Sequence, residues 1–378
     1  MHTKYEMIQD NRCTLPFGDH PGYTNDIDLT KKTVSPCCKI GKVPIDPITG
    51  ILTPELVALR KSIIKNERNE QCKSCWETED AGWLSLRKRI STHFTNTIDW
   101  NNLDPLQPIQ HIGVMFSNKC QMMCSYCSPD ASSLWEKSLN RTIPIIDNYN
   151  LAIELQNIVD ISKLKSIKFT GGEPMLDNSC VDFLRTLPVD YNRQISINTN
   201  LSYGKSVFSK LLDIIDRHQN IVIATSLDSV GDNITRKFFN WELWNDNFTK
   251  LTEIIFDTSR CTPGSILHVT VTVGMLNYTH VPAVIEYLLK FKRSGINIMF
   301  DLSPITSGAI LSLSAVDIDK TALITVSAKD QCYLTLRDRH MISAYNKMIE
   351  HSVYDPVIRE QTDSFLHQHY SITVEPHS

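Results

Sequence analysis

From about residue 108 the chain alternates short apolar runs with amphipathic segments. Runs rich in β-branched and aromatic residues predict six strands, at 111–117, 166–170, 194–200, 221–228, 267–275 and 296–302. The clearest helix between them is 206–218, whose apolar face is formed by Val207, Phe208, Leu211 and Ile215. Strands joined by helical crossovers predict a parallel sheet covered by helices. The expected fold class is α/β, a partial (β/α)6 TIM-like barrel, because a full barrel needs eight units.

The first 105 residues lack this alternation and are punctuated by glycine, proline and aspartate. One helix is predicted at 54–66, with Thr53 as its N-cap and Pro54 in the first position, and a second at about 79–93. After 305 the pattern weakens, although 343–361 is typical of a helix. We therefore expect three domains: a small, loop-rich lobe (1–105), the barrel (106–305) and a helical extension (306–378).

Charge and hydropathy narrow the class of protein. The net charge of −4, with scattered lysines, gives no footprint for duplex nucleic acid, so no such partner is expected. No run reaches the roughly 18 apolar residues of a membrane span, and residues 1–13 lack the layout of a secretory signal. We expect a soluble, cytoplasmic protein without a membrane partner.

The positions and spacing of the cysteines indicate the chemistry of the chain. Three of the eleven cysteines, Cys180, Cys261 and Cys332, stand alone and are predicted to be buried thiols. Cys120, Cys124 and Cys127 follow a C-x3-C-x2-C pattern directly after the first predicted barrel strand. A structural zinc site normally takes four protein ligands, whereas three thiolates on a four-iron cluster leave one iron open to a ligand. A Cys3His zinc site is the alternative, although the nearest histidine, His111, lies inside a predicted strand.

This cysteine triplet resembles the signature of the radical S-adenosylmethionine (SAM) enzymes. In that family the residue before the last cysteine is usually aromatic and lies against the adenine; here it is Tyr126. The second strand usually ends in a GGE-type motif whose backbone binds the SAM amino group. Here the segment is "TGGEP", which contributes Gly171, Gly172, Glu173 and Pro174. Glycine suits such a place, because backbone without Cβ can approach a ligand closely. A simple turn is the alternative reading of this segment.

Weaker matches extend the resemblance. "SLDSVG" is similar to an S-x-D-G segment, which implies that Ser226 and Asp228 contact SAM, although Ser229 replaces the usual glycine. Arg236 corresponds to an arginine that pairs with the SAM carboxylate; the alternative is a solvated helical arginine. Two asparagines end the third strand, and we expect one to line the site and the other to form a turn: Asn198 and Asn200.

A second cysteine group precedes the barrel. It comprises Cys13, Cys37 or the adjacent Cys38, Cys72 and Cys75, enough for a closed four-iron cluster. A zinc ribbon and a redox-active pair are the alternatives. The segments "CTLPF", "SPCC" and "CKSCWETEDAGWLSLR" resemble radical SAM proteins with an N-terminal twitch domain, a shortened relative of the SPASM domain that carries an auxiliary cluster. The likeness spans residues 13–305 and favours Cys37 over Cys38. Lys32 stands where that family often has glycine.

The resemblance implies the cofactors and the reaction. They are SAM, a [4Fe-4S] cluster on the triplet, and an auxiliary [4Fe-4S] cluster that assists. One electron from the first cluster would cleave SAM to a 5′-deoxyadenosyl radical, which abstracts a substrate hydrogen. The expected substrate is a ribosomal peptide side chain, with a nucleotide, sugar or other small molecule as the alternative. A flavodoxin or ferredoxin is the expected electron donor. A zinc-binding scaffold is the non-enzymatic alternative.

Overall fold

The computed structural model of the chain describes residues 11–17, 25–80, 85–88, 99–141, 151–256, 265–296, 298–305 and 311–370. The prediction for Cys261 lies outside them. Contacts divide the chain into two compact units. Unit 1 comprises 1–117, 145–169 and 192–194, and unit 2 comprises 118–144, 170–191 and 195–378. The three expected domains stay a prediction, and these units divide the chain differently.

Unit 2 is built on four neighbouring strands in the order β11-β10-β8-β7. They are β7 (Gln194–Thr199), β8 (Ile221–Ser226), β10 (Ile266–Val273) and β11 (Ile298–Pro304). Neighbouring strands among these four run parallel, and Thr270 of β10 lies between Ser226 and Asp301. Buried and half-exposed residues alternate along β7, β8 and β10, as expected where one sheet face carries the core.

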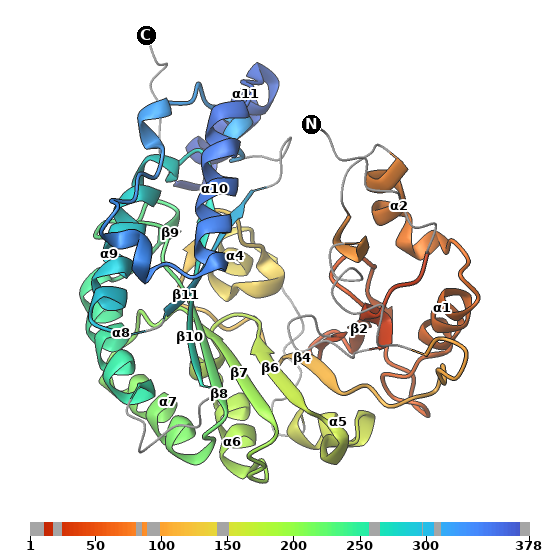
Figure 1. The fold of residues 1–378 in the computed structure, drawn as a ribbon. Helices are drawn as coiled ribbons and strands as arrows, with labels where there is room; N and C mark the ends of the chain where they lie inside the picture. The colour runs from red at the N-terminus through yellow and green to blue at the C-terminus, as the bar shows by residue number, and fades with distance from the viewer. Residues whose placement is uncertain are drawn as a thin grey trace. The chain divides into compact units, whose positions relative to one another are not determined.

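Helices cover one face of these strands (Figure 1). They are α6 (Asn178–Thr186), α7 (Lys205–Arg217), α8 (Trp241–Ile255) and α9 (Val281–Arg293). Helix α7 confirms the predicted 206–218. Its buried residues include Ile214, whereas Val207 is only half-buried, so the packed face is rotated slightly from the prediction. Unit 2 also contains the short helix α4 (Ser133–Ser138) and the paired strands β5 (Met123–Cys124) and β9 (Arg236–Lys237).

The C-terminal extension forms two helices rather than one. Helix α10 (Leu336–His351) ends before "SVYD", and α11 (Pro356–Tyr370) begins at a proline, which is favoured in a first turn. A buried ion pair, Lys292 Nζ to Asp338 Oδ2 at 2.8 Å, joins α9 to α10. Cys180 is buried as predicted, but Cys332 is exposed, so that prediction was wrong. Cys332 lies on a short 3-10 turn (Asp330–Tyr333), which leaves its side chain outside the core.

Unit 1 contains five neighbouring strands in the order β6-β4-β1-β2-β3. They are β6 (Ser166–Thr170), β4 (His111–Met115), β1 (Asn25–Asp28), β2 (Thr33–Ser35) and β3 (Val43–Pro44). Strand β1 runs parallel to β4, with Ile27 opposite Val114. The sequence did not predict the last three strands. They have two to four residues, and β1 reads "NDID", so neither length nor β-propensity marks them.

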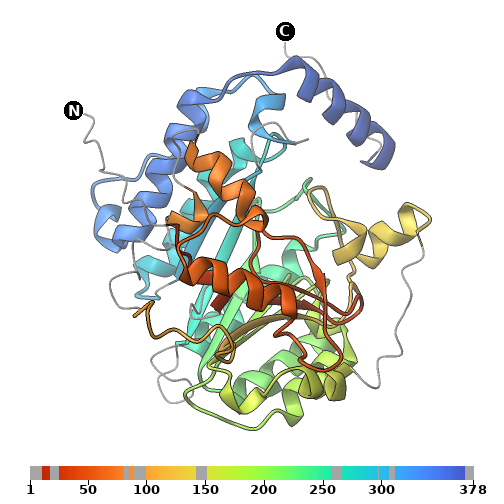
Figure 2. The same cartoon turned by 90° about the vertical axis from the view of Figure 1, so that its right-hand side faces the viewer.

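The helices of unit 1 are α1 (Pro54–Ile64), α2 (Lys73–Asp80) and α5 (Leu151–Ile158) (Figures 1 and 2). Helix α1 confirms its prediction: the Thr53 side chain accepts from Leu56 N, and Pro54 is the first residue. The helix predicted at about 79–93 left out most of α2, which begins at Lys73. Asn69 caps the preceding 3-10 turn (Glu70–Cys72), which leads directly into α2. Part of the predicted range lies outside the described residues; 86–88 is helical.

The fold class is therefore mixed α/β with a mostly parallel sheet, and the six predicted strands are confirmed. Closure of the strands into a partial barrel and a separate N-terminal lobe stay predictions. Within the described part of the chain, no helix combines the length and hydropathy that crossing a bilayer demands.

Candidate active site and second cysteine site

The loop that carries Cys120, Cys124 and Cys127 is fixed by backbone pairing and by the start of α4. Cys124 lies on β5 and pairs with Arg236 of β9 in an antiparallel ribbon. Trp135 Nε1 donates to Cys124 O at 2.8 Å, and the Ser132 hydroxyl, which also caps α4, donates to Met122 O at 2.7 Å. The loop is thus held by hydrogen bonds from several segments of unit 2, as a preorganised ligand loop must be.

The three thiols are close enough to influence one another. Burial raises the pKa of Cys120 to about 12, and the charges of Cys124 and Cys127 add to the shift. Burial likewise raises the pKa of Cys124 to about 11, where Arg236 opposes and Cys127 reinforces the shift. The structure therefore gathers three thiols that ionise with difficulty unless positive charge, such as bound metal, compensates them.

A fourth ligand from histidine finds no support. His111 lies within β4, is buried, and its Nδ1 is 2.7 Å from Ser166 Oγ. Among the described residues, no three His, Cys, Asp or Glu side chains are arranged to hold a single metal ion. Because His111 is engaged with Ser166, the three thiols suit a multi-iron cluster better than a Cys3His zinc site that would use this histidine.

Asp228, Arg236 and Tyr126 form one buried network. Asp228 Oδ2 accepts from Tyr126 OH at 2.6 Å, from Arg236 Nε at 2.9 Å and from Thr235 Oγ at 2.9 Å. The Asp228 and Arg236 side chains are 0% and 7% exposed. Arg236 Nη1 also lies 3.8 Å from Cys124 Sγ. The alternative of a solvated helical arginine was wrong, because Arg236 is buried on a strand. These residues bind one another beside the triplet.

The "GGEP" segment packs against the backbone that precedes Cys120. A Cβ on Gly172 would lie 2.3 Å from Lys119 O, so only glycine fits there. Gly171 has a φ of +119°, which glycine tolerates. Glu173 N donates to Lys119 O at 2.7 Å, and Pro174 starts a 3-10 turn. In this structure the glycines allow close approach of the cysteine loop itself.

The buried side chain of Glu173 connects this segment to the end of β7. Its carboxylate accepts from Asn200 N at 2.6 Å, Thr199 Oγ at 2.8 Å and Met175 N at 3.2 Å. Burial raises the pKa of Glu173 to about 7, against these hydrogen bonds, which favour the ionised form. Glu173 therefore orders two loops around the triplet through its side chain.

The two asparagines have different roles. Asn200 exchanges hydrogen bonds with Gln121, at 2.9 and 3.1 Å, and accepts from Ser202 N, as a turn former does. Asn198 Oδ1 is buried and receives no hydrogen bond from any described residue. A buried acceptor without a donor is costly, so Asn198 is suited to meet a ligand. Ser226 ends the neighbouring strand β8.

Ser229 fits without the usual glycine. It is not among the described residues with positive φ, and its hydroxyl donates to Asp232 O. Sequence reasoning missed three residues that support the network: Gln121, Thr235 and Asn277. Asn277 Nδ2 donates to Asp228 O at 3.0 Å. The position of Gln121 inside the cysteine motif was a usable signal; nothing in the sequence marked Asn277.

The second cysteine group also comes together, within unit 1. One small cavity is lined by Cys13, Cys37, Cys72 and Cys75. Cys37 is buried and Cys38 is exposed and does not line the cavity. Burial raises the pKa of Cys37 to about 11 and of Cys72 to about 12, and charge on Cys75 adds to both shifts. Four mutually close thiols are a donor set that fits a closed cluster.

Local structure explains how these distant cysteines meet. Cys72 closes a 3-10 turn and Cys75 lies in the first turn of α2, so both sit at one helix start. Asn25 of β1 donates its side-chain amide to Leu15 O and Pro36 O, at 3.3 and 3.1 Å. One side chain thereby ties the segment after Cys13 to the segment before Cys37.

Comparison with known proteins identifies the class of the central region. The Radical SAM superfamily model matches residues 114–288, so a radical SAM domain is present there. A domain of this superfamily uses SAM and a [4Fe-4S] cluster, and requires a reductant and a substrate.

Two curated proteins are similar to part of the chain. The GTP 3′,8-cyclase of Nautilia profundicola is 26% identical over 194 residues, which are 51% of this chain and 55% of that protein. The GTP 3′,8-cyclase of Thermodesulfovibrio yellowstonii is 28% identical over 149 residues, 38% of this chain and 43% of that protein. The chain thus spans about half the length of the curated relatives that it matches.

Proposed function

We propose that the chain is a radical SAM enzyme that activates an unreactive C–H bond of its substrate. The observation that carries this proposal is the gathering of Cys120, Cys124 and Cys127 in the matched domain, near the buried Arg236. When bound, the reduced cluster and SAM would supply a 5′-deoxyadenosyl radical that takes hydrogen from the substrate. A flavodoxin or ferredoxin is the proposed electron donor.

The chain's own residues would bind and orient the cofactor. Cys120, Cys124 and Cys127 would hold three irons. The buried acceptor of Asn198 supports a hydrogen bond from a SAM donor group. Tyr126 would face the adenine, and Arg236 would present positive charge beside Cys124. The predicted SAM contacts of Gly171, Gly172, Glu173, Pro174, Ser226 and Asp228 stay part of this proposal.

We propose a nucleotide as the first substrate class to test. The sequence favoured a ribosomal peptide, but both curated relatives are named for reactions on GTP. Low identity and partial coverage keep the peptide as the second candidate. An anaerobic assay with SAM and reductant discriminates them: 5′-deoxyadenosine formation should rise on adding purine nucleotides. If 5′-deoxyadenosine formation rises only with a peptide, the substrate class is a peptide and not a nucleotide.

We further propose that Cys13, Cys37, Cys72 and Cys75 hold the auxiliary [4Fe-4S] cluster, in a twitch-like role N-terminal to the radical SAM domain. The shared cavity and the exclusion of Cys38 from its lining support this set. A closed cluster could exchange an electron with the substrate radical or stabilise the unit that holds it.

The test of the main proposal is Cys124→Ala. This variant should form no 5′-deoxyadenosine and should lose about half of its iron, because one ligand of the three-cysteine site is gone. The matched control is Cys180→Ala, which removes a buried thiol of unit 2 that is no predicted ligand. The control should retain both properties. Full SAM cleavage by Cys124→Ala would overturn the assignment.

A further inference from the structure

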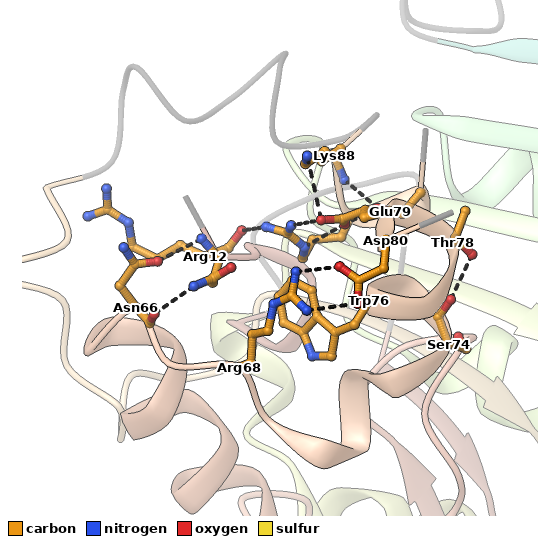
Figure 3. Close-up of polar contacts among 12 residues, drawn as sticks. Arg12, Asn66, Arg68, Ser74, Trp76, Thr78, Glu79, Asp80 and Lys88 are labelled. Atoms are coloured by element: carbon orange, nitrogen blue, oxygen red, sulfur yellow. Dashed lines mark hydrogen bonds and ion pairs between the residues drawn. The ribbon is translucent and has the colours of Figure 1, made fainter. Parts of the chain in front are cut away.

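Three polar residues of "CKSCWETEDAGWLSLR" have no part in the proposed function so far: Glu79, Ser85 and Arg87. The structure brings them together. Arg87 Nε donates to Glu79 Oε1 at 3.0 Å, Arg87 Nη2 is paired with Glu79 Oε2, and the Ser85 hydroxyl donates to Glu79 Oε1. Lys88 Nζ lies 3.7 Å from the same carboxylate (Figure 3).

This ion pair is buried and held in one geometry. The Arg87 and Glu79 side chains are 3% and 5% exposed. Arg87 Nη1 also donates to Arg12 O at 3.1 Å, and its guanidinium lies 4.3 Å from the centre of the Trp76 ring. Burying two charges costs desolvation energy that their attraction barely offsets, so stability alone is a poor reason for such a pair. The position of Arg87 in the lining of the cysteine cavity suggests an electrostatic role for the pair instead.

Arg87 is the buried cation of the four-cysteine cavity. Two cationic residues line that cavity, Lys39 and Arg87, and Lys39 is exposed. Burial raises the pKa values of Cys13 and Cys72, and the charge of Arg87 opposes both shifts. Glu79 acts in the reverse sense on Cys72. Cys72 therefore experiences both charges of the pair and Cys13 that of Arg87, in a region where water screens little.

We infer that the Glu79–Arg87 pair sets the reduction potential of the cluster held by Cys13, Cys37, Cys72 and Cys75. Reduction adds a negative charge, so the guanidinium of Arg87 favours the reduced form and the carboxylate of Glu79 limits that effect. Both act as positioning and tuning residues without ligating iron. The inference deepens the proposed auxiliary site and rests on it.

The test uses charge-removing variants of the full chain in a Cys124→Ala background, where the auxiliary site alone should hold iron. Glu79→Gln keeps the shape of the side chain and leaves Arg87 uncompensated, so the potential should rise. Arg87→Met leaves Glu79 uncompensated, so the potential should fall. Each shift should reach a tenfold change in the ratio of reduced to oxidised cluster, about 59 mV for one electron. The double variant should return close to the parent. Redox titration read by electron paramagnetic resonance measures all three.

Controls separate the possible failures. Lys39→Met removes an exposed cation and should shift the potential much less, because solvent screens it. If the cluster does not assemble in Arg87→Met, two other variants test the inference. The potential should rise in Glu79→Gln and should stay close to that of the parent in Arg87→Lys, which keeps the charge. Shifts of one sign in both single variants, or an unmoved potential with iron bound, overturn this inference alone. Absence of iron in the parent overturns the auxiliary site and the inference with it.

Discussion

Lys32 shows why a family pattern can prefer glycine at one residue. Its φ is +50°, in the left-handed region that costs an L-residue about 1–2 kcal/mol. The sequence marked this place as a departure from the resembling proteins, and the structure supplies the physical reason. The lysine gains an ion pair in return, from Nζ to Glu154 Oε1 at 3.0 Å, but its side chain is 61% exposed.

We expect Lys32→Gly to raise the free energy of unfolding by up to about 1 kcal/mol. Relief of the left-handed strain should slightly exceed the added chain entropy and the loss of an exposed ion pair. Lys32→Ala is the control, because it removes the ion pair but keeps the strain. Chemical denaturation measures both, and a glycine variant less stable than the alanine variant would contradict this account.

The raised pKa of Glu173 gives a pH prediction. Its pKa is about 7 in the folded chain, above the ordinary value of 4.5 for an exposed glutamate. Folding therefore takes up a proton between these values, and the contribution of Glu173 to stability is full below about pH 4.5 and is lost as pH rises through 7. The change can reach about 3 kcal/mol.

Glu173→Gln provides the comparison. The unfolding free energy of the wild-type chain minus that of Glu173→Gln should decline from pH 5 to pH 7.5 and then level off. A difference that stays constant across this range would show that Glu173 is ionised throughout.

At the scale of elements, long periodic segments were predictable and very short ones were not. The six strands of five to eight residues from 111 onward were all predicted, because each is a run of β-formers between turn residues. Strands β5 and β9 have two residues each and carry no periodic signature. Their pairing buries Arg236 beside Asp228, so its surroundings could not be predicted. The start of α2 was missed because its cap, Asn69, precedes a 3-10 turn rather than the helix itself.

The β5–β9 ribbon should depend on its buried ion pair. We expect Arg236→Met to lower the unfolding free energy of unit 2 by about 3–5 kcal/mol, because Asp228 would keep a buried charge without its cation. Tyr126→Phe removes one neutral donor to the same carboxylate and should cost only about 1–3 kcal/mol. Denaturant titration of both variants measures the gap, and equal losses would argue against a dominant charge effect.

At the scale of the whole molecule, each compact unit contains one complete cysteine set. The sequence predicted both sets and preferred Cys37 to Cys38, and the structure gathers Cys13, Cys37, Cys72 and Cys75 around a cavity. The sequence could not predict the division into units, because β1 pairs with β4, which lies more than eighty residues further along the chain. Such long-range pairing is set by tertiary packing, and nothing local in "NDID" records it.

This separation predicts that iron can be removed from one unit without the other. The proposed chain should carry about eight irons, and Cys75→Ala should retain about four, because the three-cysteine site in unit 2 is intact. The matched control is Cys38→Ala. It removes a thiol that is exposed outside the cavity, so the iron content should stay unchanged.

Unit 1 of Cys75→Ala should also exchange its amide hydrogens faster, since metal binding contributes to folding where ligands come from distant segments. Iron analysis and hydrogen exchange on the anaerobic protein measure both effects. If Cys38→Ala lost iron and Cys75→Ala kept all of it, Cys38 would be a ligand and Cys75 would not. That result would refute the ligand set that the cavity supports.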